Sequence, residues 1–166
     1  MPTFVKFDGV RMSPAEDPFT YLTDDQELVP GDVIISLTRF QADGDRLLHE
    51  GRSVGVRLEG DERVEALTYD LPRIAVVALA FPKFRDGRQY SNARVIRERY
   101  GFKGQLRAVG DVLREQAGFM LRCGFDAFEP ADGSTAEEWE LATQRFRHVY
   151  QRAVDGRVPA FVAREA

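Results

Sequence analysis

The sequence predicts an α/β fold: a single domain of repeated β-α units with a mainly parallel five-stranded sheet, preceded by a short N-terminal hairpin. Three observations lead to this prediction. Short apolar runs alternate with amphipathic segments between residues 32 and 153. The strongest run, residues 74–81, is almost uninterrupted apolar sequence, as in a strand that is buried on both faces. Glycine or proline ends most of the segments.

Strands that alternate with helices pair in parallel through right-handed crossovers. Two architectures satisfy this pattern, an open doubly wound sheet and a partial β/α barrel, and the sequence leaves both open. In either of them, the loops that follow the strands gather at one edge of the sheet, where ligands bind. We expect a hairpin and acidic lead-in over residues 1–31, the α/β domain over 32–153 and a tail over 154–166.

The expected strands are short and bounded by turn residues. Residues 3–11 are typical of a hairpin that turns at Asp8-Gly9, and the proline-containing stretch 12–31 is predicted to be irregular. The strands of the main sheet are predicted at residues 33–37, 54–58, 74–81, 106–109 and 125–128.

The expected helices follow these strands and stop at glycine or proline. They are predicted at residues 39–50, 61–71, 91–100, from Gly110-Asp111 to Gly124, and from residue 134 onward. The last one begins with Ser134-x-x-Glu137, the pattern of a capping box. Its apolar stripe is expected to bury Trp139, Ala142, Phe146, Val149 and Tyr150.

Composition limits the class of protein. A chain of 166 residues with 43% hydrophobic residues is long enough for one core. No stretch approaches the length of a membrane span, and the first residues lack the pattern of a secretory signal. The single cysteine, Cys123, fits a reducing cytoplasm. The net charge of −4 argues against general nucleic-acid binding.

The net charge hides an asymmetry along the chain. Residues 83–107 hold eight basic side chains against two acidic ones, whereas residues 1–32 hold two basic against seven acidic. A run of charge usually marks a solvated helix face, and we expect this for Arg97, Arg99 and Lys103. Basic residues nearer the strand ends fit an electropositive mouth for a small anion or an acidic partner.

The loop that follows residues 74–81 is the strongest site candidate. It carries bases, an aspartate and a glycine at a strand's carboxyl end and a helix's amino end, where backbone N–H groups converge. The expected anion-binding residues are Lys83, Arg88, Ser91 and Arg107. Arg88 would be the main donor, because an arginine presents a two-pronged fork to an oxyanion. Ser91 would cap the following helix.

Two carboxylates near strand ends are candidates for acid–base chemistry. Asp86 and Asp111 each follow a strand and could share catalytic work or hold an arginine. The structural alternative is a turn at Asp86-Gly87 and an N-cap at Asp111. Cys123 is expected to be structural, because a thiolate is disfavoured at a helix C-terminus.

The usual redox signatures are missing from the sequence. The chain has no Cys-x-x-Cys pair and no Gly-x-Gly-x-x-Gly after a strand. Its two histidines, His49 and His148, stand apart without ligand spacing. We therefore expect no bound cofactor and no metal, and a self-sufficient oxidoreductase is disfavoured.

A long ordered motif set resembles a known bacterial family. It runs through Phe81-Pro82-x-Phe84-x-Asp86-Gly87-Arg88-x-Tyr90-Ser91-x-Ala93-Arg94, Arg97-Glu98-Arg99-Tyr100-Gly101, Arg107-Ala108-Val109-Gly110-Asp111-Val112-Leu113-Arg114 and Arg122-Cys123-Gly124-Phe125-Asp126-Ala127-Phe128. With Val29-Pro30-Gly31 and Tyr150-Gln151, this resembles the family known as domain of unknown function nine-three-four. Its members are often labelled oxidoreductases of sulfite reduction, because they accompany assimilatory sulfate-reduction enzymes.

The resemblance and the residues together give the expected function. We expect an auxiliary protein of assimilatory sulfate or sulfite reduction that binds a small oxyanion or an acidic partner through residues 82–91. One alternative is a cofactor-free lyase, isomerase or transferase that acts on an anionic metabolite with Asp86 or Asp111 as base. A second alternative is a docking protein for sulfite reductase that uses the basic helix face. No nucleic-acid or membrane partner is expected.

Overall fold

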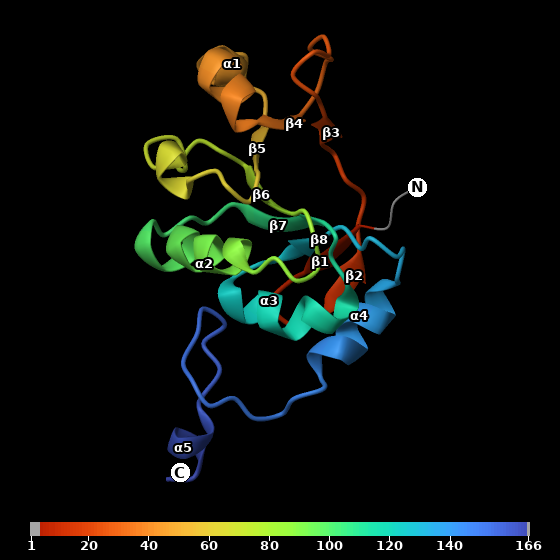
Figure 1. The fold of residues 1–166 in the computed structure, drawn as a ribbon, viewed down its shortest axis with the longest axis vertical. Helices are drawn as coiled ribbons and strands as arrows, with labels where there is room; N and C mark the ends of the chain where they lie inside the picture. Colours follow the sequence, from red (N-terminus) through yellow and green to blue (C-terminus); the bar gives the residue numbers. More distant parts are fainter. Residues whose placement is uncertain (1–3, 166) are drawn as a thin grey trace.

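The computed structural model describes residues 4–165 and contains one eight-stranded sheet with the order β2-β1-β8-β7-β6-β5-β4-β3 (Figure 1). The strands are β1 (Val5–Phe7), β2 (Met12–Pro14), β3 (Thr20–Tyr21), β4 (Val33–Ser36), β5 (Val54–Leu58), β6 (Val76–Phe81), β7 (Gln105–Gly110) and β8 (Ala127–Phe128). The prediction of an α/β fold is confirmed. The prediction of five strands is wrong, because the lead-in adds three strands to the same sheet.

Six strands, β3 to β8, are parallel and lie in chain order, while β1 and β2 are antiparallel. When neighbouring strands follow one another in sequence, right-handed crossovers place every connection on the same face. The sheet is curved, and the face opposite these connections is its concave inner face. The sheet is therefore a half-barrel and not a doubly wound sheet. The hairpin expected at Asp8-Gly9 is present as β1 and β2, and β1 extends the sheet beyond β8.

The helices lie on the outer face of this curl, and the C-terminal segment extends from the end of the molecule opposite α1 (Figure 1). They are α1 (Leu37–His49), α2 (Arg88–Arg94), α3 (Ala117–Cys123), α4 (Ala136–Thr143) and α5 (Ala160–Ala163). None of the helices within residues 4–165 has the length and apolar character needed to cross a membrane.

Several predicted helices are shorter than expected. Residues 61–71 form only a 3-10 turn, Val64–Leu67, whose apolar side chains are buried without a full helix. The helix predicted from residue 134 onward is α4, which stops at Thr143, and its capping box is formed by Thr135 and Glu138, one residue later than predicted. The expectation that the last helix buries Phe146 and Tyr150 is wrong, because both follow the helix and are 70% and 80% exposed.

Side chains alternate between two faces of the central strands. On β6, Val77 and Leu79 face the helices in the larger core, while Val76, Ala78 and Ala80 belong to a smaller cluster on the inner face. Phe19 and Tyr21 pack against this smaller cluster. The small inner side chains therefore leave room for the lead-in to lie across the inside of the curl.

Candidate functional site

The loops after β6 and β7 lie at the same edge of the sheet, as the sequence predicts for consecutive β-α units. The two strands are parallel, and Phe81 is the register partner of Gly110 at their carboxyl ends. The loop formed by residues 82–87, called here the β6 loop, therefore begins beside residues 110–113.

Hydrogen bonds from the β7 side hold the β6 loop in place. The Asp111 carboxylate accepts the Phe84 N–H at 2.8 Å, and the Asp111 N–H donates to the Phe81 carbonyl at 2.8 Å. The Gln116 side chain donates to the Phe84 carbonyl and to the Tyr90 hydroxyl. Asp111 thus anchors the loop. It is not an N-cap, because the next helical turn begins at Arg114 with Leu113 at the capping position.

Asp86 and Arg88 form a two-pronged ion pair within this edge. Arg88 Nε lies 3.0 Å from Asp86 Oδ1, and Nη2 lies 2.6 Å from Oδ2. Hydrogen bonds from the Arg88 side chain and backbone lower the pKa of Asp86 to about 2. A carboxylate with so low a pKa is a weak base near neutral pH. The fork of Arg88 is occupied by Asp86 in this arrangement.

The Asp86 pKa gives a direct test of this geometry. We expect Asp86 to stay ionised as the pH falls and to take up a proton only near pH 2. Because the folded-state pKa lies below the ordinary value, the pair's stabilisation is present above about pH 4 and is lost as the pH falls toward 2. NMR titration of the Asp86 carboxyl carbon measures this. In Arg88→Ala the midpoint should return toward the ordinary value, whereas a wild-type midpoint near 4 would contradict the ion pair.

The helix that follows the β6 loop starts earlier than predicted. Arg88 is the first residue of α2 and Gly87 is at the N-cap position, so the expectation that Ser91 caps the helix is wrong. Ser91 lies one turn inside the helix and is exposed. Lys83 and Arg85 are exposed on the loop, and within residues 4–165 neither has a carboxylate within ion-pair distance. The structure therefore brings Lys83, Asp86, Arg88 and Asp111 to one edge.

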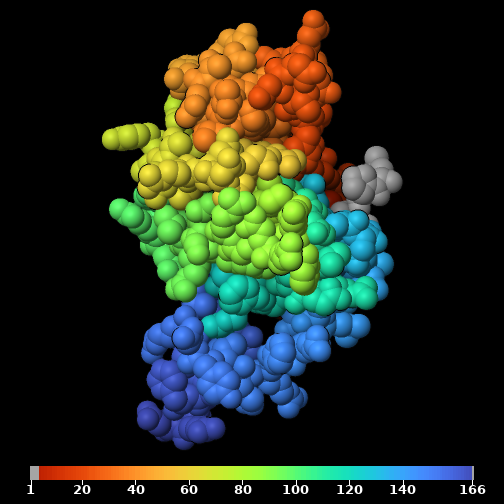
Figure 2. Space-filling view, in the orientation of Figure 1, coloured from red at the N-terminus to blue at the C-terminus, as the bar shows by residue number. Residues whose placement is uncertain are grey.

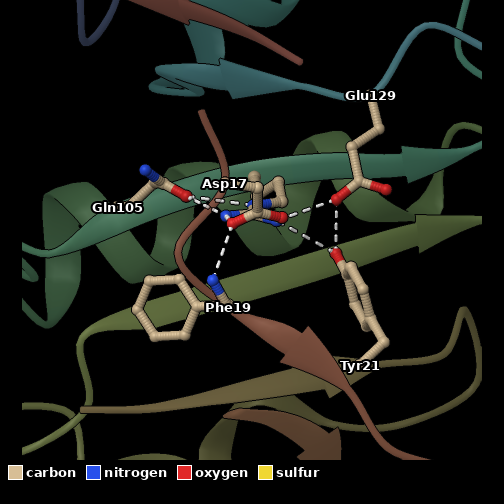
Figure 3. Close-up of polar contacts among 6 residues, drawn as sticks. Asp17, Phe19, Tyr21, Gln105 and Glu129 are labelled. Carbon is tan, nitrogen blue, oxygen red and sulfur yellow. Dashed lines mark hydrogen bonds and ion pairs between the residues drawn. The ribbon is translucent and has the colours of Figure 1, made fainter. Parts of the chain in front are cut away.

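Arg107 lies elsewhere, on the inner face of the curl, and Figure 3 shows its partners Asp17, Tyr21, Gln105 and Glu129. Its side chain is fully buried and forms ion pairs with Asp17 at 2.6 Å and with Glu129 at 2.9 Å. Its Nε and Nη2 also donate to Gln105 Oε1 at 3.0 and 2.8 Å. With both Asp17 oxygens engaged, all five N–H groups of the guanidinium have partners. Arg107 is not brought to the β6 loop.

The surroundings of Arg107 keep it charged and close the curl. Burial by itself lowers the pKa of the Arg107 guanidinium, but the Asp17 and Glu129 carboxylates outweigh burial and raise it overall. The Phe4 ring lies 4.3 Å from the guanidinium carbon and covers it. Tyr21 on the edge strand β3 donates to Glu129, which directly follows β8. This contact joins the two ends of the parallel strand series across the inner face.

The partners of Arg107 were not predicted from sequence, although a signal was present. In a strand with period two, Arg107 shares a face with Gln105 and Val109, and its neighbours Leu106 and Ala108 belong to the other face. A charged side chain at a central position of a buried strand needs a buried partner. The acidic lead-in could supply one, but choosing Asp17 requires knowledge of the curl.

Cys123 is buried as expected for a structural cysteine, whereas Arg97 is not on a solvated helix face. Cys123 is buried, and burial raises the pKa of its thiol to about 11, in agreement with a structural role. The expectation that Arg97 lies on a solvated face is wrong, because it pairs with Asp126 at 2.9 Å and donates to backbone carbonyls. Arg99 and Lys103 are exposed as expected. Over residues 4–165, no group of three or more His, Cys, Asp or Glu side chains is arranged to hold a metal ion.

Comparison with known proteins identifies the family. The sequence profile described as "Bacterial protein of unknown function (DUF934)" matches residues 55–161, which is more than half of the chain. The chain belongs to this family. The match includes the β6 loop, the strand with Arg107 and the helices α2 to α4, whereas Asp17 and Tyr21 lie before it. None of the curated proteins compared with the chain matches it.

Proposed function

We propose that this family member is an auxiliary protein of assimilatory sulfite reduction, which docks through its β6 loop onto an acidic surface of a sulfite-reduction enzyme. The observation that carries the proposal is the exposed sequence Lys83-Phe84-Arg85 on an anchored loop. Two cations, neither of which has a carboxylate within ion-pair distance in the described residues 4–165, flank Phe84, which is 45% exposed. An aromatic side chain between bases, on a rigid loop, is typical of a protein-binding anchor.

The same contacts favour a protein partner over a small oxyanion. An oxyanion would have to displace Asp86 from the Arg88 fork, and Arg107 is buried on the inner face. Lys83 and Arg85 can meet carboxylates on a partner surface without any internal ion pair being broken. We therefore propose a protein partner for the β6 loop in place of a small oxyanion.

An enzymatic role has less support from the two candidate carboxylates. Asp86 is held as an anion by Arg88, and the Asp111 carboxylate accepts the Phe84 N–H. Neither is positioned as a free base beside an open cavity in the described part of the chain. The link to sulfur metabolism rests on the label that members of the family carry, and the missing redox signatures favour a supporting role beside a redox enzyme.

Charge reversal on the loop tests the proposed function. We expect Lys83→Glu/Arg85→Glu to weaken binding to purified assimilatory sulfite reductase by about 10-fold or more, measured by calorimetry, because like charges would then face each other. Wild-type binding should also weaken as salt is added. The matched control is Arg99→Glu/Lys103→Glu, which changes the net charge equally at exposed positions.

The control distinguishes docking through the β6 loop from diffuse attraction to the basic helix face. Equal weakening by both double variants would replace loop docking with diffuse attraction to the basic helix face. Absence of any binding would reject the sulfite-reductase partner. Titration with sulfate and sulfite covers the oxyanion reading: saturable binding that Arg88→Ala abolishes would overturn the preference for a protein partner.

A further inference from the structure

A large groove lies between the α3–α4 layer and the C-terminal segment, which comprises residues 144–165. The groove is on the side of the molecule remote from α1 (Figure 2). Its volume is about 730 Å³, within the range of binding sites. The residues that matter for its chemistry are Arg114, Phe119, Leu141, Arg145, Phe146 and Tyr150. The groove is separate from the inner face that Arg107 occupies.

The walls of the groove present large apolar side chains to solvent. Phe119, Leu141, Phe146 and Tyr150 are between 58% and 80% exposed. A concentration of exposed aromatic and aliphatic groups around one hollow marks an interaction surface. A closed small-molecule site would cover these rings, whereas this groove is open along one side and suits a segment of chain laid across it.

The groove is basic, although the whole protein is acidic. Its lining holds four arginines against two glutamates, while the net charge of the chain is −4. Arg114 pairs with Glu138, and Arg122 pairs with Asp155. Arg145 and Arg157 have no carboxylate within ion-pair distance in residues 4–165, so positive charge remains for a partner.

The C-terminal segment forms one wall of the groove, and hydrogen bonds hold it against α3. The Arg122 side chain reaches Asp155 and the Gln151 carbonyl, and the Val154 N–H donates to the Arg122 carbonyl at 3.1 Å. Arg157 donates to the carbonyls of Phe146 and Arg147 at 3.0 and 2.7 Å. These bonds hold the wall in position while the Phe146 and Tyr150 side chains stay exposed.

We propose that this groove binds an acidic segment of a partner protein, with aromatic or leucine side chains of the segment seated among Phe119, Phe146 and Tyr150 and its carboxylates facing Arg145 and Arg157. Arginine and aromatic residues together are the side chains that most often dominate protein–protein binding. The excess of positive charge selects an acidic segment over a basic one. The inference does not depend on the β6 loop or on the proposed function.

A peptide-display selection against the whole protein tests the proposal. We expect the selected peptides to combine acidic residues with aromatic residues or leucine. In fluorescence anisotropy, a selected peptide should bind Phe146→Ala/Tyr150→Ala and Arg145→Glu about 10-fold or more weakly than the wild type. Both sites are exposed, so the variants should keep the thermal stability of the wild type. The matched control is Tyr69→Ala, which removes a 95% exposed tyrosine outside the groove and should leave affinity unchanged.

Several results would contradict binding of an acidic segment in the groove. Selection of basic or uncharged peptides, no selection above background, or equal binding to wild type and groove variants would overturn the inference. So would self-association of the wild type in sedimentation that Arg145→Glu abolishes, because the occupant would then be a second copy of the chain. Lys83→Glu/Arg85→Glu should bind the peptide normally, so failure of the proposed function would leave this result intact.

Discussion

Replacing Arg107 with methionine is expected to destabilise the protein by about 3–5 kcal/mol, which is the usual cost of breaking a buried ion pair from one side. Arg107 is fully buried, and both Asp17 and Glu129 would lose their cationic partner. Methionine fills much of the volume but satisfies neither carboxylate nor Gln105. Urea denaturation of both proteins measures the difference in the free energy of unfolding.

Two further variants test whether the loss of stability comes from the ion pairs of Arg107. Asp17→Asn should cost less than Arg107→Met, because Glu129 still neutralises the guanidinium and Asp17 is about a quarter exposed. Arg99→Met, at an exposed position, should change the free energy of unfolding by no more than about 0.5 kcal/mol. An Arg107→Met protein as stable as the wild type would show that the ion pairs of Arg107 with Asp17 and Glu129 contribute nothing to the free energy of unfolding.

The same variant should loosen the lead-in selectively. Arg107 holds Asp17, while Tyr21 reaches Glu129, so residues 15–21 are tied across the inner face by side chains from β7 and the end of β8. The Leu22 N–H donates to the Ile34 carbonyl at 3.0 Å. Hydrogen exchange at Leu22 should therefore rise more than exchange within β6, because local opening would release the edge strand first.

The parts of the fold that depend on local pattern were predictable. The apolar run at residues 74–81 gives β6, and the turn at Asp8-Gly9 gives the hairpin. The strand β3 could not be predicted, because Thr20-Tyr21 is too short to show a period and pairs with β4 only inside the curl. The end of α4 at Thr143 also has no local cause in the sequence, since the apolar spacing continues to Tyr150.

The candidate site was predictable in position and less so in its contacts. The sequence places Lys83, Asp86 and Asp111 at strand ends, and the parallel register brings them to one edge. The role of Arg107 depends on contacts with Asp17, 90 positions away in the chain. Such a contact follows from the curl of the sheet and has no signature in residue spacing. The groove beside α3 is likewise formed by segments whose packing no periodicity predicts.

Replacing Gly110 with alanine is expected to cost about 2–5 kcal/mol and to displace the β6 loop. Gly110 has a φ of +93°, where a side chain adds about 1–2 kcal/mol of strain. A Cβ there would also lie 2.4 Å from the Phe81 carbonyl oxygen, which is backbone within the sheet and can move only with its strand. Crowding of this kind typically adds about 1–3 kcal/mol.

The displacement matters for function because the crowded carbonyl is the one that accepts the Asp111 N–H, while the Asp111 carboxylate holds Phe84. Faster hydrogen exchange at Asp111 and Phe84, with weaker binding of the acidic partner, is the expected result. Gly51→Ala is the matched control: its φ is +74°, and nothing lies within 4 Å of the added Cβ. Its cost should be limited to backbone strain, with partner binding unchanged. If the two variants were equally stable and bound the partner equally well, the contact with Phe81 would not be what positions Lys83-Phe84-Arg85.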